Sequence, residues 1–331
     1  MTEPVTDPTK PGIVAIGRNE GQRLQLCLMS VLGRSGPLVY VDSGSTDDSA
    51  RVARQLGATV VELDLSIPFT AARARNQGFQ QLMRMAPTLE FVQFVDGDCE
   101  IQPEWLEKAG EYLAGHPQVA VVAGRRRERF PEHSIFNHMC DEEWNTPIGE
   151  TLTCGGDAMM RTTALQAVQG YRDSLIAGEE PELCFRLREK GWKIIRLDAE
   201  MTRHDANILH FQQWWKRTRR AGHAYAEGAW LHGKHPERHY VRETLRGLIW
   251  GLILPALVLI TSISVSPWLG SALALIYPLQ IVRIAQRNSQ QKHRWWLATY
   301  LVLGKFAEAS GILQFALRKL LHRQARLIEY K

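Results

Sequence analysis

Short apolar runs alternate with amphipathic segments through the first part of the chain, and this alternation constrains the fold more than any other feature. Runs rich in β-branched and aromatic residues predict strands at 12–16, 37–41, 58–63 and 91–95. Apolar residues at helical spacing in 24–32 predict a helix between the first two strands. We also expect a helix at 69–83, strands at 152–160 and 193–197, and a long irregular segment at 124–150 that is either a substrate lid or an insertion. Strands and helices that alternate in this way form right-handed βαβ units. The sequence therefore predicts an α/β fold with a mostly parallel sheet flanked by helices.

Two aspartates separated by one glycine, Asp96 and Asp98, follow the strand predicted at 91–95. Ligands of open α/β sheets bind at the carboxyl ends of strands, and Gly97 lets the backbone turn so that both carboxylates can face one point. Converging oxygen ligands suit Mg²⁺ or Mn²⁺, and such ions bridge phosphate oxygens. The same residues are common in strand-end turns. The tripeptide alone is therefore consistent with a metal–diphosphate site or with a polar turn.

The composition excludes some classes of protein. The 331 residues are enough for one large or two modest domains. The five cysteines form no CxxC pair and no zinc-site spacing, so we expect free thiols and no disulfide framework. Residues 1–11 are polar and contain no apolar core, which predicts a disordered leader and not a signal peptide. The net charge of +5 is concentrated in 203–246 and 283–294.

Two apolar runs, at 247–264 and 267–282, contain no charged residue. A membrane-spanning helix needs roughly 20 residues, so the second run is short unless it tilts. We interpret 243–284 as a transmembrane hairpin. The alternative is a buried helical hairpin within a soluble domain.

Basic and aromatic residues flank this hairpin on both sides. Residues 206–242 contain Trp214 and Trp215 among lysines and arginines, which predicts an amphipathic segment at the membrane surface in contact with membrane lipids. Residues 285–331 predict a basic, amphipathic helix that lies on the interface or, alternatively, forms a third span. The positive-inside rule places both flanks in the cytoplasm. No nucleic-acid-binding motif accompanies the basic patch, so we expect no nucleic-acid partner.

The order of the polar motifs resembles that of family 2 glycosyltransferases with the GT-A fold, over about residues 12–205. The motifs that carry the resemblance, besides DGD at 96–98, are VAIGRNE (14–20), VDSGSTDDS (41–49), ARARNQG (72–78), CGGDAMMR (154–161) and GEEPELCFRL (178–187). The resemblance implies an α/β catalytic domain at 12–205 that uses a nucleotide-diphosphate sugar, with a UDP-sugar as the expected donor, and Mg²⁺ or Mn²⁺.

The resemblance also implies which residues hold the nucleoside. Asp42 would accept hydrogen bonds from the base or ribose, and Asn19 and Glu20 would lie at the neighbouring strand edge. The alternative for the segment after Asp42 is helix capping, which fits Ser45 and Asp47 better than it fits Asp42.

An arginine is expected on the nucleotide or diphosphate side of the donor. Arg73 is our candidate because a guanidinium donates two hydrogen bonds to phosphate, with Arg75 as its competitor and a solvated arginine as the alternative. The resemblance implies that the glycine turn, with Gly156 and Asp157, also contacts the donor.

The metal ligands follow from the same resemblance. Asp98 would bind the ion directly, and Asp96 would reach the ion or the ribose. His204 follows the last predicted strand and would complete the metal shell, unless it is merely structural.

Inversion at the sugar needs a base on the acceptor side. In the family this base is the second acidic residue of a Glu-Asp turn; here the turn reads Glu179-Glu180. We therefore assign Glu180 as the base, with Glu179 as the alternate. The departure from the family adds one methylene of reach. Acidic residues at a helix N-terminus are the alternative explanation, which fits Glu182 better.

The chain lacks the Gln-x-x-Arg-Trp motif of processive synthases, which argues for transfer of one sugar per acceptor. The prediction is an inverting, metal-dependent glycosyltransferase that acts on a lipid-linked or glycan acceptor in cell-envelope or exopolysaccharide synthesis. We expect it at the bacterial inner membrane with its catalytic domain in the cytoplasm. The alternatives are transfer onto a polyprenyl phosphate, and a non-catalytic membrane scaffold that retains the fold.

Overall fold

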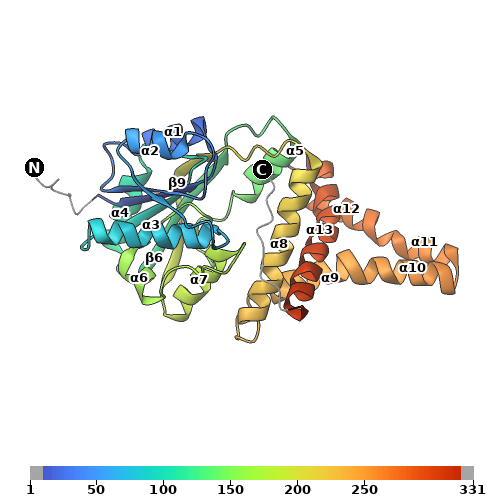
Figure 1. Cartoon of the computed structure of the whole chain (residues 1–331). Helices are drawn as coiled ribbons and strands as arrows, with labels where there is room; N and C mark the ends of the chain where they lie inside the picture. The colour runs from blue at the N-terminus through green and yellow to red at the C-terminus, as the bar shows by residue number, and fades with distance from the viewer. Residues whose placement is uncertain (1–9, 322–331) are drawn as a thin grey trace, which may run out of the picture. The chain divides into compact units, whose positions relative to one another are not determined.

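A computed structural model describes residues 10–321 (Figure 1). These residues divide into two compact units. The first comprises the described residues through Phe130 together with Cys140–Ala206, and the second comprises Pro131–Met139 and the described residues after Ala206. Most of the leader predicted at 1–11, and residues 322–331 of the predicted C-terminal helix, lie outside the described residues.

The first unit is built on a nine-stranded sheet with the order β3-β2-β1-β4-β8-β6-β9-β5, and β7 pairs with β9. The predicted βα alternation forms its parallel half, β1 (Gly12–Gly17), β2 (Leu38–Asp42), β3 (Thr59–Glu62) and β4 (Phe91–Asp96). Of these strands, β1, β2 and β4 are largely buried and β3, at the edge of the sheet, is not; helices lie on both sides of the sheet (Figure 1). The predicted α/β class is therefore confirmed.

The other half of the sheet is mixed. Its strands are β5 (Cys99–Ile101), β6 (Val119–Glu128), β7 (Gly149–Glu150), β8 (Ala158–Arg161) and β9 (Lys193–His204). β6 and β9 are parallel, whereas β8 is antiparallel to β4 and β6, and β5 and β7 are antiparallel to β9. The long β9 brings its last residue, His204, opposite Cys99 at the start of β5.

The helices of the first unit, with α5 shared between the units, are α1 (Gln22–Met29), α2 (Ser49–Gln55), α3 (Ala71–Met85), α4 (Trp105–Gly115), α5 (Ile135–Glu143), α6 (Thr162–Ala167) and α7 (Glu179–Glu189). The Thr70 hydroxyl caps α3 by accepting a hydrogen bond from the Arg73 N–H at 3.1 Å. Gly78 lets α3 lie close to the sheet, because a Cβ there would be 2.3 Å from Val14 Cγ1. This close packing fixes the helix that carries Arg73 and Arg75.

Three predicted boundaries in the first unit are wrong. Residues 124–150, predicted as an irregular lid or insertion, contain the end of β6, α5 and β7. The strand predicted at 152–160 begins only at Ala158, and the strand predicted at 193–197 continues to His204. The charges that suggested a loop are paired across the sheet, as in the Arg127–Glu200 ion pair at 2.7 Å.

The second unit is helical. It contains α8 (Phe211–His232), α9 (Val241–Leu248), the π-helical turn η1 (Ile249–Ile253), α10 (Leu254–Ser264), α11 (Pro267–Ala274), α12 (Ile276–Arg287) and α13 (Arg294–Leu320). α8 and α13 approach closely at two glycines: a Cβ on Gly222 would lie 2.1 Å from the Glu308 carbonyl oxygen, and one on Gly311 would lie 2.0 Å from the Arg219 carbonyl oxygen.

Two stretches of this unit, Val241–Ser264 and Pro267–Arg287, are long and apolar enough to cross a membrane. Few of their residues are buried, unlike those of a core helix in a soluble protein. The predicted pair of apolar C-terminal helices is therefore present, and its exposure fits a membrane anchor.

Candidate active site

Acidic side chains from separate parts of the chain gather beyond the end of β4. β4 ends at Asp96, and the Gly97 N–H donates to the Ile16 carbonyl at 2.8 Å, which turns the chain toward Asp98. Asp157, just before β8, accepts a hydrogen bond from the Asp96 N–H at 3.1 Å. The strand ends therefore bring together three of the carboxylates that the sequence singled out.

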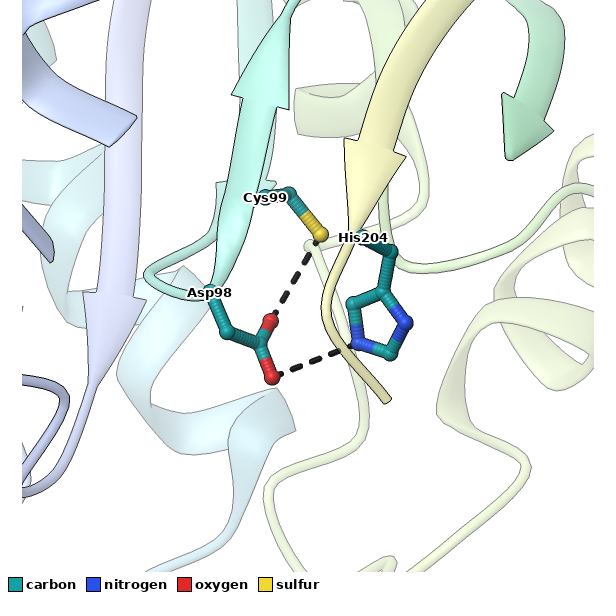
Figure 2. A group of neighbouring side chains, drawn as sticks. All are labelled: Asp98, Cys99 and His204. Carbon is teal, nitrogen blue, oxygen red and sulfur yellow. Dashed lines mark hydrogen bonds and ion pairs between the residues drawn. The ribbon is translucent and has the colours of Figure 1, made fainter. Parts of the chain in front are cut away.

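Asp98 lies against the end of β9 (Figure 2). Its Oδ2 is 3.3 Å from His204 Nε2, and its Oδ1 is 3.5 Å from Cys99 Sγ. The ligand atoms of these three residues lie within 4.8 Å of one another, and all three residues are buried. The predicted pairing of Asp98 with His204 is therefore present as a contact, with a thiol beside it.

A second group that could hold a metal consists of Asp96, Cys99 and Asp157. Burial, together with the negative charge of Asp157, raises the pKa of the Cys99 thiol well above its usual value. The thiol is therefore protonated at neutral pH. The carboxylates and the imidazole are the donors in the two groups that suit a hard divalent cation.

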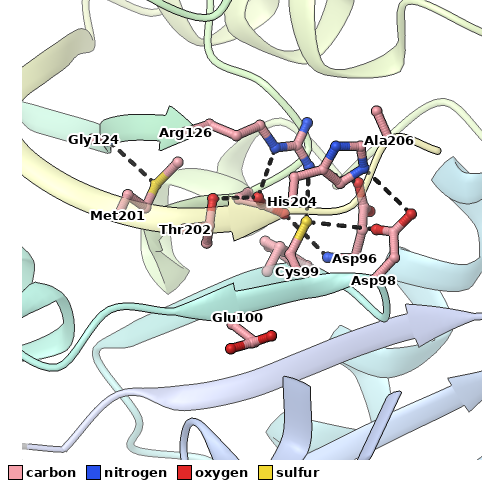
Figure 3. A network of polar contacts seen from close by, with 12 residues as sticks. Asp96, Asp98, Cys99, Glu100, Gly124, Arg126, Met201, Thr202, His204 and Ala206 are labelled. Atoms are coloured by element: carbon pink, nitrogen blue, oxygen red, sulfur yellow. Dashed lines mark hydrogen bonds and ion pairs between the residues drawn. The ribbon is translucent and has the colours of Figure 1, made fainter. Parts of the chain in front are cut away.

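Arg126 contacts the carboxylates and the thiol of these two groups (Figure 3). Its guanidinium donates to Asp157 Oδ2 at 2.9 Å, to Asp96 Oδ2 at 3.0 Å and to Cys99 Sγ at 3.3 Å. Asp157 is fully buried and also accepts a hydrogen bond from the Thr202 hydroxyl at 2.8 Å. Asp157 is therefore fixed by its neighbours, which makes it a residue that orients Asp96.

Arg75 connects Asp96 to the glutamates of the predicted catalytic turn. It donates to Asp96 Oδ1 at 2.8 Å and forms ion pairs with Glu179 at 3.0 Å and Glu180 at 2.9 Å. The Arg75 side chain is 2% exposed. Burial opposes the ionisation of Asp96, yet the charges of Arg75 and Arg126 lower its pKa. The DGD motif and the Glu-Glu turn, some eighty residues apart, thus share one cation.

Glu179 and Glu180 form the first turn of α7, after Gly178 in the left-handed conformation at φ 77°. The Glu180 side chain is 13% exposed and that of Glu179 is 5% exposed, so Glu180 is the more accessible of the two. Burial, and next the charge of Glu179, raise the pKa of Glu180 to about 7 against the opposing effect of Arg75. A carboxylate with that pKa can accept a proton near neutral pH.

Gly156 lies where these groups converge. A Cβ on Gly156 would be 2.5 Å from Arg75 Nη2, 2.9 Å from Asp96 Oδ2 and 3.2 Å from Glu180 Oε1. A glycine is therefore needed at this position for the cation and the two carboxylates to meet.

The residues predicted at the nucleoside form a separate turn next to this cluster. The Asp42 carboxylate accepts hydrogen bonds from the N–H groups of Gly44 and Ser45, and from the hydroxyls of Ser45 and Tyr40. Asn19 Oδ1 accepts a hydrogen bond from the Thr46 N–H at 2.7 Å. Asp42 and Asn19 thus fix the loop between β2 and α2.

Glu20 lies beside two glycines of the site. Its side chain pairs with Arg23 at 2.8 Å, and Cβ atoms on Gly17 and Gly97 would lie 3.0 and 3.1 Å from Glu20 Cγ. Glu20 therefore adjoins the DGD turn, as its place after β1 predicts.

Arg73 does not join the carboxylate cluster. Its guanidinium donates to the carbonyl oxygens of Ile67 and Asp64, both at 2.8 Å, and so holds the loop before α3. The sequence named Arg75 only as its competitor, and the structure places Arg75 in the cluster.

The sequence did not single out Arg126, Cys99 or Trp144 as site residues. Trp144 packs edge-on against His204, with ring centroids 4.8 Å apart, and the Arg126 guanidinium lies 5.2 Å from its ring centroid. No local pattern distinguishes Arg126 within the run Arg125-Arg126-Arg127, because the register of β6 against β9 shifts on both sides of Arg125.

A comparison with family models matches residues 13–167 to the model described as Glycosyl transferase family 2. The matched segment includes the turn after Asp42, Arg75, the DGD motif, Arg126 and the glycine turn. It stops before the Glu179-Glu180 turn.

Two curated proteins illustrate the similarity in sequence. Glycosyltransferase AglE of Haloferax volcanii is 24% identical over 189 residues, which cover 53% of this chain and 60% of that protein. Succinoglycan biosynthesis protein ExoA of Rhizobium meliloti is 24% identical over 193 residues, which cover 54% of this chain and 58% of that protein. The chain thus matches less than two thirds of the length of these relatives.

A solved structure, the mannosyltransferase PcManGT from Pyrobaculum calidifontis in complex with GDP-Man and Mn²⁺, is similar over 93% of this chain and 89% of that chain. The TM-score is 0.62 and the identity is 19%. At this identity the likeness shows a shared fold, which confirms the predicted GT-A type of architecture.

Proposed function

We propose that the chain is an inverting glycosyltransferase that uses a nucleotide-diphosphate sugar, because residues 13–167 match the family 2 glycosyltransferase model. One observation carries the proposal: Arg75 pairs at once with Asp96 of the DGD motif and with Glu179 and Glu180 of the turn. This places a donor-side carboxylate and a candidate base in one cluster.

The proposed chemistry is a direct displacement. The acceptor hydroxyl oxygen forms a bond to the anomeric carbon of the sugar, and the bond from that carbon to the diphosphate oxygen breaks. Glu180 takes the hydroxyl proton, because it is the more exposed glutamate and its pKa of about 7 suits a base near neutral pH. Arg75 holds Glu180 in place through their ion pair.

The residues around Asp98 fit a divalent cation. Asp98 and His204 supply an oxygen and a nitrogen in contact, and Asp96 adds a carboxylate beside them. When bound there, Mg²⁺ or Mn²⁺ would neutralise the charge that develops on the leaving diphosphate. Arg126 keeps Asp96 and Asp157 in fixed positions.

The donor base, the acceptor and the location belong to the same proposal. The family resemblance favours a UDP-sugar, whereas PcManGT was solved with GDP-Man. The two exposed apolar helices favour an acceptor at a membrane, such as a lipid-linked glycan, in cell-envelope or exopolysaccharide synthesis. A bacterial inner membrane with the first unit in the cytoplasm fits the basic flanks of those helices.

A donor screen on the full chain in lipid nanodiscs tests this function. We expect one of the UDP-, GDP- or dTDP-sugars to raise the melting temperature when Mn²⁺ is present. Labelled sugar should then appear on a lipid-linked glycan acceptor. Asp98→Ala should remove both the effect of Mn²⁺ and the transfer, whereas Asp48→Ala, at an exposed ion pair, should change neither.

Three outcomes would contradict the proposal. Transfer that persists unchanged in a chelator would exclude the role of the metal. Donor binding without turnover on any acceptor would indicate a scaffold, and transfer only to a polyprenyl phosphate would replace the glycan acceptor.

A further inference from the structure

A cavity of about 800 Å³ lies in the first unit, outside the carboxylate cluster. Its wall includes Arg125 and Arg127 of β6 and Arg196 of β9, but not Arg126. Arg126 instead meets Asp96 and Asp157 of the carboxylate cluster. The cavity and the carboxylate cluster therefore share no lining residue.

Two buried guanidinium groups form the inner wall of the cavity. Arg125 is 6% exposed and Arg196 is 5% exposed. The Nε atoms of both are buried and have no hydrogen-bond acceptor among the described residues. A buried donor without a partner costs roughly 1–3 kcal/mol, so these atoms would gain from an acceptor that enters the cavity.

The two arginines differ in their charge balance. Arg125 pairs with Asp141 at 2.9 Å. Arg196 donates to the Leu197 carbonyl, and no carboxylate within residues 10–321 lies at ion-pair distance from it. Burial and the positive charge of Arg125 lower the pKa of Arg196, whereas Asp198 and Glu200 oppose this shift. Of these two arginines, Arg125 therefore has an ion-pair partner and Arg196 has none among the described residues.

The rim adds two more cations and an apolar surface. Arg127 pairs with Glu200, and Lys108 pairs with Glu104 at 2.5 Å; these side chains are about half exposed or more. Pro103, Pro147 and Ile148 supply apolar surface. The volume lies within the range of about 300–1,000 Å³ that is typical of small-molecule sites.

We propose that this cavity binds a small phosphorylated molecule, with its phosphate group between Arg125 and Arg196 and its remaining atoms against the apolar rim. Guanidinium groups bind phosphate with paired hydrogen bonds. Two guanidinium groups match the double negative charge of a phosphate group better than they match the single charge of one carboxylate. The site is separate from the proposed donor site and does not need a divalent cation.

Calorimetric titration of the full chain in detergent, with EDTA present, tests the proposal. The probes are inorganic phosphate, glucose 1-phosphate and malonate at constant ionic strength. We expect saturable binding of glucose 1-phosphate and weaker binding of phosphate and of malonate, because neither fills the apolar rim and only a phosphate group gathers its charge on one atom centre. Arg196→Leu, which retains apolar bulk, should weaken glucose 1-phosphate binding at least about tenfold, because a hydrogen bond to a charged group contributes about 1.5–3 kcal/mol.

A second variant keeps the test valid if Arg196→Leu does not fold. Ile148→Glu places a negative charge on the rim at a side chain that is 61% exposed, and it should weaken binding several-fold. The matched control is Met29→Glu, at an exposed position of α1, which should bind as the unmodified chain does. Donor binding with Mn²⁺ should survive all three changes, so failure of this site is distinguishable from failure of the proposed function.

The proposal is overturned if no probe binds saturably, or if the Arg196 and Ile148 variants bind glucose 1-phosphate as tightly as the control. Malonate binding equal to that of glucose 1-phosphate would also overturn it, since the site would then select carboxylates.

Discussion

The side chain of Arg75 shows how one residue organises the candidate site. It is buried, and its charge is balanced by Asp96, Glu179 and Glu180. A buried cation without such partners would be strongly unfavourable, so the four groups hold one another in place. From the sequence we expected Arg73, two positions earlier on α3, to be the arginine that binds the diphosphate. Each helical residue advances about 100° around the axis, so the two arginines point in different directions.

The raised pKa of Glu180 predicts the pH dependence of transfer. As a base it must be ionised, and its pKa is about 7, so kcat/KM should fall tenfold per pH unit below about pH 7 and level off above it. Glu179→Gln removes a charge that raises this pKa, and the acid limb should move to lower pH. Profiles of kcat/KM against pH for both proteins measure this. An acid limb that stays in place or moves to higher pH would contradict the assignment.

At the scale of elements, the glycine turn before β8 sets the distance between the groups of the site. Gly156→Ala should lower kcat/KM by about tenfold or more, because the added Cβ meets Arg75, Asp96 and Glu180, and overpacking costs about 1–3 kcal/mol. Gly155→Ala is the matched control, since the nearest atom to its added Cβ is Arg126 Nη1 at 3.9 Å. Steady-state kinetics and melting temperatures of the two variants test this. Equal activity in both would mean that Gly156 does not set the site.

The sequence predicted the elements whose signal is local. The apolar strand before Asp96 follows from its length and its β-branched and aromatic content, and the helix with Arg73 and Arg75 is likewise a prediction for a single segment. The continuation of β6 through Arg125, Arg126 and Arg127 could not be predicted from its own segment, because three consecutive charged residues are typical of a loop. In the structure these residues pair with β9 through the backbone, and their charges pair with Asp141, Asp157 and Glu200, which are distant in sequence.

The candidate site was predictable to a similar degree. Asp98 and His204 were paired on the strength of the family resemblance, and the structure brings them into contact. The contributions of Arg126 and Trp144 depend on the end of β6 and on the segment after α5, which sequence patterns did not resolve. Long-range pairing thus sets the limit of what local patterns can show.

At the scale of the whole molecule, the chain combines a GT-A-type unit with a helical unit that has two exposed apolar stretches. We expect the full chain to float with liposomes and to resist carbonate extraction. A double change, Leu257→Arg with Ile260→Arg, should abolish this, because each arginine in a membrane span costs about 3 kcal/mol. Met29→Arg, at an exposed site of α1, is the control. Flotation of the double variant as complete as that of the control would contradict a membrane-spanning hairpin.

We propose Glu180 as the base of a glycosyl transfer. The most direct test measures donor binding and sugar transfer side by side for the full chain and for Glu180→Gln, with Glu189→Gln at the exposed end of α7 as the control. We expect Glu180→Gln to bind the donor with Mn²⁺ as before and to transfer at least about a hundredfold more slowly, the range of general-base catalysis. Transfer by Glu180→Gln at the rate of the control would exclude Glu180 as the base.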